Sequence, residues 1–406
     1  MAAIQTKLLS ICLLRRKVLQ TGLRLASTVP SSSFKYEDLE VTLTNTPQPK
    51  PDDNNLIFGH HFSDHMLTVD WTAQTGWSKP VIHPVEEMRI HPAAKVLHYA
   101  VELFEGVKAY RCEDGKVRVF RPMENMKRMR STAERSALPD FDGDELCKCI
   151  KKLISIDSAW VPRSDRCSLY IRPTFIGTEP TLGVVKSNAA KLFVLIGPVG
   201  PYYPTGFKPV TLLADPQYVR AWPGGCGAYK MGANYAPTIQ IQDTAVKEEG
   251  CQQVLWLYGE DHMMTEVGTM NLFVYLINEK GEEELVTPPL NGLILPGVTR
   301  KSLLELAREW NEFKVSERDI KMKEFVKALN ERRIKEVFGA GTACLVSPVE
   351  GIKYQGQHLV IPTMETAVLT NRFNNILMDI QYGRTPHRWM EPVDEEGQRM
   401  QEVSRV

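Results

Sequence analysis

The sequence predicts an α/β protein with two domains. Runs of β-branched and aromatic residues, which are typical of strands, alternate with segments whose apolar residues recur at helical spacing. Residues 200–208 are rich in proline and glycine, a composition that favours a linker between folded units. A chain of 406 residues with 43% hydrophobic residues is also long enough for two or three domains with substantial cores.

The first predicted domain comprises residues 58–199. Helical periodicity occurs at residues 125–136 and 144–159, and Asp144 is a candidate N-cap of the second helix. Strands are expected at residues 67–71, 117–120, 168–173 and 191–197. Residues 31–57, which precede this domain, are expected to form an extended arm.

The second predicted domain comprises residues 209–391. We expect a helix directly after Pro237. Further elements are expected as strands at residues 253–258 and 272–277 and helices at 300–311 and 322–331. Residues 392–406 form an acidic tail, which is expected to be disordered.

The first thirty residues form a distinct leader. They contain five basic residues and no acidic residue, since the first acid is Glu37, and leucines and isoleucines are interspersed among them. This composition is typical of a mitochondrial transit peptide, which predicts a location in the mitochondrial matrix. A disordered or secretory start is the alternative.

Composition excludes several other classes. Lys and Arg together number 49, as do Asp and Glu, so no charge excess indicates nucleic-acid binding. No apolar run reaches the roughly 18 residues of a membrane span. Eight cysteines without a Cys-x-x-Cys pair argue against a zinc ribbon or a disulfide scaffold, and no metal site is expected.

The candidate catalytic residue is Lys230, which lies in a glycine-rich segment. Glycines before and after Lys230 would let the backbone approach a flat ligand closely. A lysine amine in a partly desolvated pocket loses its proton more readily and attacks carbonyl groups. A solvated surface lysine is the alternative, and the phosphate-loop pattern Gly-x-x-x-x-Gly-Lys-Ser/Thr is absent.

Two downstream residues fit an aldehyde cofactor held by that amine. Pyridoxal phosphate withdraws electrons best when its ring nitrogen is protonated, which a carboxylate partner ensures. Glu266 follows a predicted hairpin and is a candidate for this role, while the hydroxyl of Tyr235 could donate to the phenolic oxygen of the ring. An ordinary turn glutamate and a half-buried tyrosine are the alternatives.

The segment Trp-Pro-Gly-Gly-Cys-Gly-Ala-Tyr-Lys-Met-Gly-Ala-Asn-Tyr at 222–235, followed by Thr-Glu-Val-Gly-Thr-Met-Asn at 265–271, resembles the branched-chain amino acid aminotransferases. These are pyridoxal-phosphate enzymes of fold type IV. The resemblance extends from about residue 31 to 392 and closely matches the animal mitochondrial form. It implies a smaller N-terminal α/β domain and a larger C-terminal α/β pseudo-barrel domain.

The resemblance also implies a reaction and cofactor contacts. The amino group of L-leucine, L-isoleucine or L-valine would pass to 2-oxoglutarate in a ping-pong reaction, the first step of branched-chain amino acid breakdown. Besides Lys230, the implied cofactor contacts are Arg128, Tyr235, Glu266, Thr269, Val298, Thr299 and Thr342. Arg128 suits a phosphate, and so do the amides of Val298 and Thr299, which lead into the predicted helix at 300–311.

The implied substrate contacts form a second group. The amides of Thr342 and Ala343, with the hydroxyl of Tyr99, would bind the substrate α-carboxylate. An aromatic wall favours branched side chains and comprises Phe58, Tyr99, Phe104, Tyr170 and Tyr202. Arg172 would bind the distal carboxylate of glutamate. Leu182 and Val184 would come from a second subunit, which implies a homodimer.

One position departs from the family pattern. The animal enzymes carry Cys-x-x-Cys after the turn, whereas this chain has Cys344-Leu-Val-Ser347. A thiol without its partner cannot form that disulfide, so redox regulation of this kind is not expected. A branched-chain keto-acid dehydrogenase complex is a candidate partner by resemblance to the mitochondrial members.

Alternative functions fall into two classes. Within the same fold, D-amino acid aminotransferases and aminodeoxychorismate lyases also use a lysine and a glutamate, but are not expected to combine this aromatic wall with a Gly-Thr-Ala turn. A non-catalytic protein that binds a metabolic partner is the other alternative. The presence of both Lys230 and Glu266 argues against it.

Overall fold

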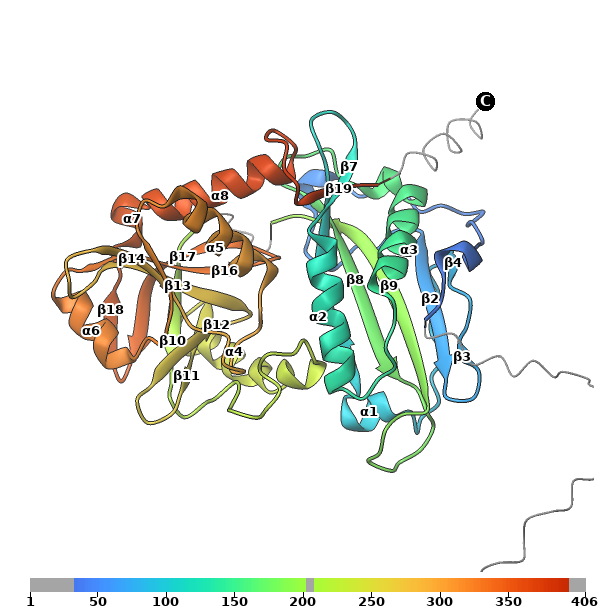
Figure 1. The fold of residues 1–406 in the computed structure, drawn as a ribbon, viewed down its shortest axis with the longest axis horizontal. Coiled ribbons are helices and arrows are strands. Elements are labelled where there is room, and N and C mark those ends of the chain that lie inside the picture. Colours follow the sequence, from blue (N-terminus) through green and yellow to red (C-terminus); the bar gives the residue numbers. More distant parts are fainter. Residues whose placement is uncertain (1–32, 202–207, 394–406) are drawn as a thin grey trace, which may run out of the picture.

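The structure is a computed structural model that describes residues 33–201 and 208–393. In these ranges the strands form two β-sheets, one mainly from the N-terminal half of the chain and one from the C-terminal half, in adjacent lobes (Figure 1). The predicted leader and most of the predicted linker lie outside the described residues, and the predicted domain boundaries stay predictions.

The first sheet has the order β1-β4-β2-β9-β8-β6-β7-β19, with β3 paired to β2 and β5 paired to β8. Its strands are β1 (Glu40–Val41), β2 (His65–Thr72), β3 (Gly76–Trp77), β4 (Val81–Pro84), β5 (Glu102–Phe104), β6 (Val107–Arg111), β7 (Val117–Phe120), β8 (Ser168–Gly177), β9 (Ala189–Val199) and β19 (Met390–Pro392). The four strands expected in this half are confirmed, and β8 and β9 extend beyond the predicted ranges.

Helices α1 (Lys95–Tyr99), α2 (Pro122–Arg135) and α3 (Gly143–Ile156) belong to this half. The α3 face that bears Leu146, Ile150 and Leu153 is fully or almost fully buried in the core of the first sheet. The predicted N-cap is wrong by two residues: the side chain of Asp142 accepts from the amides of Asp144 and Glu145, because its extended backbone points the carboxylate at the first turn.

The second sheet has the order β12-β11-β10-β17-β16-β13-β14-β15, with β18 paired to β17. Its strands are β10 (Val210–Ala214), β11 (Gln253–Tyr258), β12 (Met263–Val267), β13 (Met270–Ile277), β14 (Glu283–Thr287), β15 (Lys314–Glu317), β16 (Ile334–Gly341), β17 (Leu345–Tyr354) and β18 (Gln357–Val360). An additional pairing joins β12 to β13 and closes part of the sheet into a ring. The predicted pseudo-barrel is therefore confirmed.

Helices α4 (Thr238–Lys247), α5 (Val298–Trp310), α6 (Met322–Asn330), α7 (Thr363–Thr366) and α8 (Val368–Gln381) accompany this second sheet. Aromatic rings pack α8 onto it: Phe273 and Phe338 stack with centroids 5.3 Å apart, and Phe373 of α8 lies 5.9 Å from Phe338. The helices expected here are confirmed within a few residues at each end. No helix in the described ranges has the length and apolar character of a membrane span.

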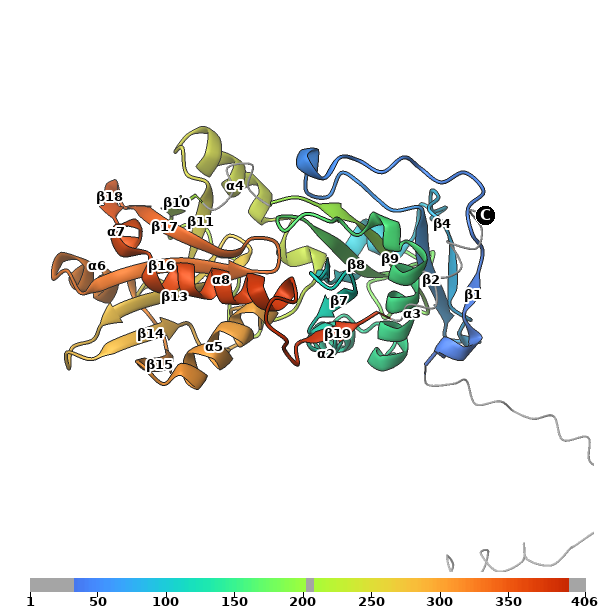
Figure 2. The same cartoon turned by 90° about the horizontal axis from the view of Figure 1, so that it is seen from above.

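The two ends of the described chain both contact the first sheet. Strand β1 pairs in parallel with β4, so the expected arm contains a short strand, and the segment after it runs along the outside of the sheet (Figure 2). Strand β19 pairs with β7, and Val393 behind it is buried. The prediction of disorder from residue 392 is therefore wrong at its first two residues, because backbone pairing and apolar burial hold them.

Candidate active site

A cavity of about 270 Å³ lies between the two lobes and is lined by both of them. The first lobe contributes side chains from β5, α2 and β8. The second contributes the glycine-rich loop, the β12–β13 hairpin, the start of α5 and the turn after β16. Predicted residues that line the cavity are Phe58, Phe104, Arg128, Tyr170, Arg172, Lys230, Tyr235, Glu266, Thr269, Val298, Thr299, Thr342 and Ala343.

The amine of Lys230 lies inside this cavity. Its Nζ is 3.1 Å from the hydroxyl of Tyr235 and 4.7 Å from the ring centroid of Phe104. The backbone carbonyl of Lys230 accepts from the amide of Phe104, and its amide donates to Thr132 Oγ1, so the first lobe holds the lysine on both sides. An amine fixed next to a phenol can exchange a proton with it.

Two of the glycines around Lys230 lie in tight contact with other protein segments. A Cβ at Gly227 would lie 2.7 Å from the carbonyl oxygen of Leu293, and a Cβ at Gly232 would lie 1.8 Å from Oε1 of Glu102. These glycines therefore allow close packing against other protein segments. The loop is also fixed by Asn234, whose Nδ2 donates to two of its carbonyls.

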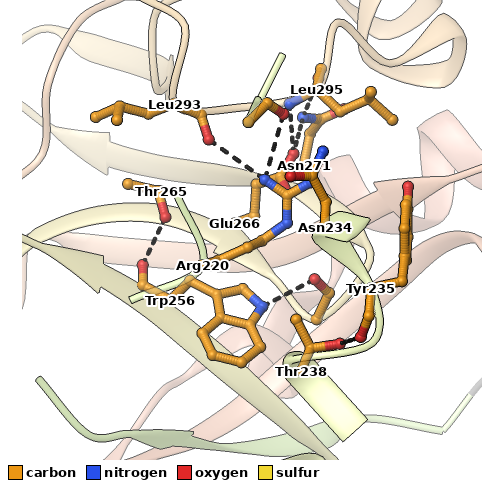
Figure 3. Close-up of polar contacts among 12 residues, drawn as sticks. Arg220, Asn234, Tyr235, Thr238, Trp256, Thr265, Glu266, Asn271, Leu293 and Leu295 are labelled. Atoms are coloured by element: carbon orange, nitrogen blue, oxygen red, sulfur yellow. Dashed lines mark hydrogen bonds and ion pairs between the residues drawn. The ribbon is translucent and has the colours of Figure 1, made fainter. Parts of the chain in front are cut away.

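Glu266 lines the same cavity and is surrounded by donors (Figure 3). Its Oε1 accepts from the amide of Leu295 at 2.8 Å and from Nδ2 of Asn271 at 3.2 Å, and its Oε2 lies 3.0 Å from Nε of Arg220. Burial raises the pKa of this carboxyl, while Arg220, the Leu295 amide and Lys230 act in the opposite direction.

One end of the cavity lies at the start of α5 and suits an anion. Gly297 is the N-cap and no side chain caps this helix, and Val298 and Thr299 of the first turn line the cavity. Arg128 reaches the same place from α2, where its Nη1 donates to the carbonyl of Pro296. Free amides, the positive end of a helix dipole and a guanidinium together suit a phosphate group.

A turn between β16 and β17 forms a further wall, which contains Thr342 and Ala343. Buried Lys108 of β6 donates from Nζ to the carbonyl of Ala343 at 3.0 Å. Burial lowers the pKa of this lysine to about 8. The first lobe therefore fixes the orientation of the peptide that follows Ala343.

Aromatic side chains form the opposite wall. The rings of Phe58 and Tyr170 meet edge to face with centroids 4.9 Å apart, and those of Phe104 and Tyr235 are separated by the same distance. The guanidinium of Arg172 lies 4.8 Å from the Phe104 ring centroid, and its Nη2 donates to the hydroxyl of Tyr170. One cation is therefore held within an otherwise apolar wall.

Not every predicted residue lies at this cavity. Tyr99, Leu182 and Val184 are outside its lining, and Leu182 and Val184 are 62% and 80% exposed. The hydroxyl of Tyr99 donates to the carbonyl of Leu182, so these residues form their own surface cluster. Tyr202 lies outside the described residues.

Besides Thr132, which accepts from the amide of Lys230, sequence reasoning missed four residues whose side chains contact predicted site residues. Glu105 binds Arg128, Arg220 and Asn271 bind Glu266, and Lys108 binds the turn at Ala343. Two of them had a local signal: Glu105 lies next to Phe104, and Asn271 belongs to the quoted motif at 265–271. Arg220 and Lys108 had none, since their partners are distant in sequence.

The comparisons with known proteins agree with this fold and cavity. Residues 102–352 match the family model described as amino-transferase class IV. The chain is 58% identical over 361 residues to the cytosolic branched-chain-amino-acid aminotransferase of Mus musculus, covering 88% of this chain and 93% of that protein. It is 54% identical over 366 residues to the mitochondrial form of Bos taurus, covering 89% and 93%.

Solved structures show the same fold. The branched-chain amino acid aminotransferase of Escherichia coli matches with a TM-score of 0.65 at 23% identity, over 80% of this chain and 99% of that chain. The corresponding enzyme of Thermobaculum terrenum, solved in its PLP form, matches with a TM-score of 0.64 at 20% identity, over 82% and 100%.

The fold and the family model together define a class IV aminotransferase, a class that depends on pyridoxal phosphate. Within that class, the chain belongs to the branched-chain-amino-acid aminotransferase family, because more than half of its residues are identical to these relatives over most of both chains. Cytosolic and mitochondrial forms match about equally well, so similarity does not single out the mitochondrial form.

Proposed function

We propose that this protein transfers the amino group of L-leucine, L-isoleucine or L-valine to 2-oxoglutarate, giving branched-chain 2-oxo acids and L-glutamate. One observation carries the proposal: a single cavity contains an amine, a buried carboxylate, an anion-binding helix start and an aromatic wall. The rival enzymes of the same fold are not favoured, because the relatives that match over most of the chain are branched-chain enzymes.

The cavity residues fit pyridoxal phosphate at both of its ends. Val298, Thr299 and Arg128 suit the phosphate, with Thr269 and Thr342 in the same lining. Glu266 at the other end suits a protonated ring nitrogen. The bound cofactor supplies an electron sink that acidifies the α-proton of the amino acid.

The remaining chemistry falls to two side chains. The Nζ of Lys230 would hold the cofactor through its aldehyde group, and the same amine, when free, would accept the α-proton of the amino acid as a base and give it back as an acid. The hydroxyl of Tyr235, 3.1 Å from Nζ, holds the amine in the cavity and would donate to the phenolic oxygen of the bound cofactor.

The substrate side chain and carboxylates have separate contacts. Phe58, Phe104 and Tyr170 exclude water and favour branched apolar groups, at about 0.8 kcal/mol per buried methylene. Arg172 within this wall binds the distal carboxylate of glutamate, so one pocket accepts both substrates. The amides of Thr342 and Ala343 bind the α-carboxylate.

We also propose a homodimer. Tyr99, Leu182 and Val184 are exposed and lie together away from the cavity of their own chain. An exposed apolar loop of this kind suits a second copy, where it would complete the pocket of the partner. Size-exclusion chromatography with light scattering tests this, and a monomer at full activity would contradict it.

Location in the mitochondrial matrix rests on the basic, acid-free leader at residues 1–30. Import of the full chain into isolated mitochondria, compared with a chain lacking the leader, is the direct test. Binding to a branched-chain keto-acid dehydrogenase complex rests on resemblance to mitochondrial relatives, and a pull-down with that complex tests it.

The first experiment is an absorption spectrum of the purified, cofactor-loaded protein before and after L-leucine is added without a keto acid. We expect the visible band of the lysine-linked cofactor to be replaced by the band of the aminated cofactor. A band that persists with L-leucine but disappears with D-alanine would agree with the fold and would show that the substrate differs from the proposed one. Absence of any cofactor band would contradict the catalytic function itself.

A further inference from the structure

We propose that Arg220 is a positioning residue that favours the charged form of the Glu266 carboxylate and directs it into the cavity. The inference rests on the proposed function, in which Glu266 is the partner of the ring nitrogen. It assigns a role to a buried cation that lacks a local sequence signal. Figure 3 shows the guanidinium between the carboxylate and the loop that contains Leu293.

The geometry is that of a buried ion pair with further anchoring. Nε of Arg220 lies 3.0 Å from Oε2 of Glu266, and the two side chains are 4% and 3% exposed. Nη1 of Arg220 donates to the carbonyls of Gly227 and Leu293 at 3.4 and 3.3 Å. Since the planar guanidinium is fixed at several points, the direction of its Nε–H toward Glu266 is also fixed.

The carboxylate keeps acceptor capacity for the cavity. Its Oε1 accepts from the Leu295 amide and from Asn271, and Oε2 faces Arg220. An ionised carboxylate has about four acceptor positions, so these three donors leave room for one more. Because Glu266 lines the cavity, a protonated ring nitrogen is the donor that fits that position.

Charge explains why this arginine matters. Burial favours the neutral form of Glu266 and raises its pKa. The charged groups that face the carboxyl are Arg220, Lys230, Arg128 and, more weakly, Arg300. Among these groups, Arg220 lowers the pKa of Glu266 the most. It is also the group among them whose side chain makes an ion pair with Glu266. Loss of Arg220 would raise the pKa of Glu266 further and so favour the protonated carboxyl, which is a poorer acceptor for the ring nitrogen.

Arg220 also connects three parts of the site. It lies ten residues before Lys230, and it contacts the glycine-rich loop at Gly227, strand β12 at Glu266 and the segment before α5 at Leu293. A purely mechanical clamp would use the same carbonyl contacts, so the experiment has to separate the charge from the clamp.

The test uses the apoenzymes of wild type, Arg220→Met, Arg220→Lys, Glu266→Gln and the double variant Arg220→Met/Glu266→Gln. Each is titrated with pyridoxal phosphate, and the visible band of the bound cofactor is followed against pH. We expect Arg220→Met to bind the cofactor about tenfold or more weakly and to shift the pH titration of the band. Arg220→Lys, which keeps a cation, should titrate nearer to wild type.

The double variant separates the two explanations. If Arg220 acts through the charge of Glu266, the double variant should bind the cofactor no more weakly than Glu266→Gln alone. If Arg220 is only a clamp, its loss should add fully to the loss caused by Glu266→Gln, and our inference is overturned. A wild-type pH titration in Arg220→Met would overturn it as well.

Thermal unfolding of the apoenzymes gives a readout that does not depend on the cofactor. Folding raises the pKa of the Glu266 carboxyl above 4.5. The folded protein therefore becomes less stable as pH rises from 4.5 through that raised pKa. The Tm deficit of Arg220→Met should therefore grow with rising pH, and the double variant should lack this growth.

If Arg220→Met does not fold, a folded double variant supports the inference and an unfolded one overturns it. Failure of wild type to bind the cofactor would instead contradict the proposed function.

Discussion

The side chains of Arg128 and Glu105 form a two-point ion pair at the edge of the cavity. Nε of Arg128 lies 2.8 Å from Oε1 of Glu105, and its Nη2 lies 2.7 Å from Oε2. Both are buried, and Nδ2 of Asn125 also donates to the carboxylate. The remaining nitrogen of Arg128, Nη1, is directed at Pro296 beside the start of α5. Glu105 therefore fixes the guanidinium in the place where a phosphate would bind.

Replacing Glu105 with Gln should weaken binding of pyridoxal phosphate. The isosteric amide removes the charge that holds the arginine, and breaking a buried pair costs about 3–5 kcal/mol in stability. Titration of the apoenzyme with cofactor measures the effect. Glu124→Gln is the matched control, since Glu124 lies on the same helix as Arg128 and pairs with Lys301 outside the cavity. Equal affinities of both variants would contradict this role of Glu105.

The same pair predicts how stability depends on acid pH. Burial opposes ionisation of Glu105, but the charge and hydrogen bonds of Arg128 outweigh burial, and the pKa of the carboxyl is lowered from 4.5. A lowered pKa gives stability that is fully present above 4.5 and is lost as pH falls through the folded value. The Tm difference between wild type and Glu105→Gln should therefore be constant near neutral pH and shrink below 4.5. A Tm difference that widens as pH falls would contradict this prediction.

Replacing Lys230 with Ala should abolish turnover. The variant loses both the covalent link to the cofactor and the group that moves the α-proton, so the rate should fall by about 10²–10⁴-fold or more. Single-turnover kinetics with L-leucine on the cofactor-loaded variant measures this. Lys323→Ala, which changes an exposed lysine of α6, is a control for general effects of losing an amine. Near-wild-type activity of Lys230→Ala would end the proposed mechanism.

Replacing Ser347 with Cys should make the enzyme sensitive to peroxide. Burial raises the pKa of the Cys344 thiol to about 12, which leaves little reactive thiolate in wild type. Among the described residues, Oγ of Ser347 has no hydrogen-bond partner, so a thiol there leaves no protein donor unsatisfied. Activity after peroxide, with and without a reducing agent, is the measurement. Ser347→Ala is the control, and equal inactivation of both variants would refute the missing-disulfide explanation.

Local sequence patterns predicted the elements well because these depend on neighbouring residues. Strands β7 and β11 lie where alternation and β-branched content placed them, and α5 and α6 follow the apolar periodicity within a few residues. The N-cap of α3 was wrong because Asp142 and Asp144 both suit a cap, and only the backbone conformation at Asp142 selects between them. The pairing of β19 with β7 had no local signal, since its partner is far away in sequence.

The site shows the same division. Lys230, Tyr235 and Glu266 were identified from one continuous stretch, because a lysine loop and a hairpin bring them together locally. Phe104, Arg128 and Arg172 came from family resemblance, and the structure places them at the same cavity. Tyr99, which was expected to bind the α-carboxylate, does not line the cavity, because its hydroxyl donates to the carbonyl of Leu182. Leu182 and Val184 do not line it either, and their predicted place depends on a second copy.

By itself, the sequence determined the α/β class and the family and singled out Lys230 as the candidate catalytic amine, because residue type and short-range spacing carry that information. The tertiary structure decided which charges compensate one another. Glu105 on Arg128, Arg220 on Glu266 and Lys108 on the carbonyl of Ala343 are pairs between separate segments. Such pairing follows from burial, since a buried charge needs a partner within hydrogen-bond distance. Which residue supplies that partner depends on how distant segments pack, within one lobe for the first two pairs and between the lobes for Lys108 and Ala343, and no local pattern encodes it.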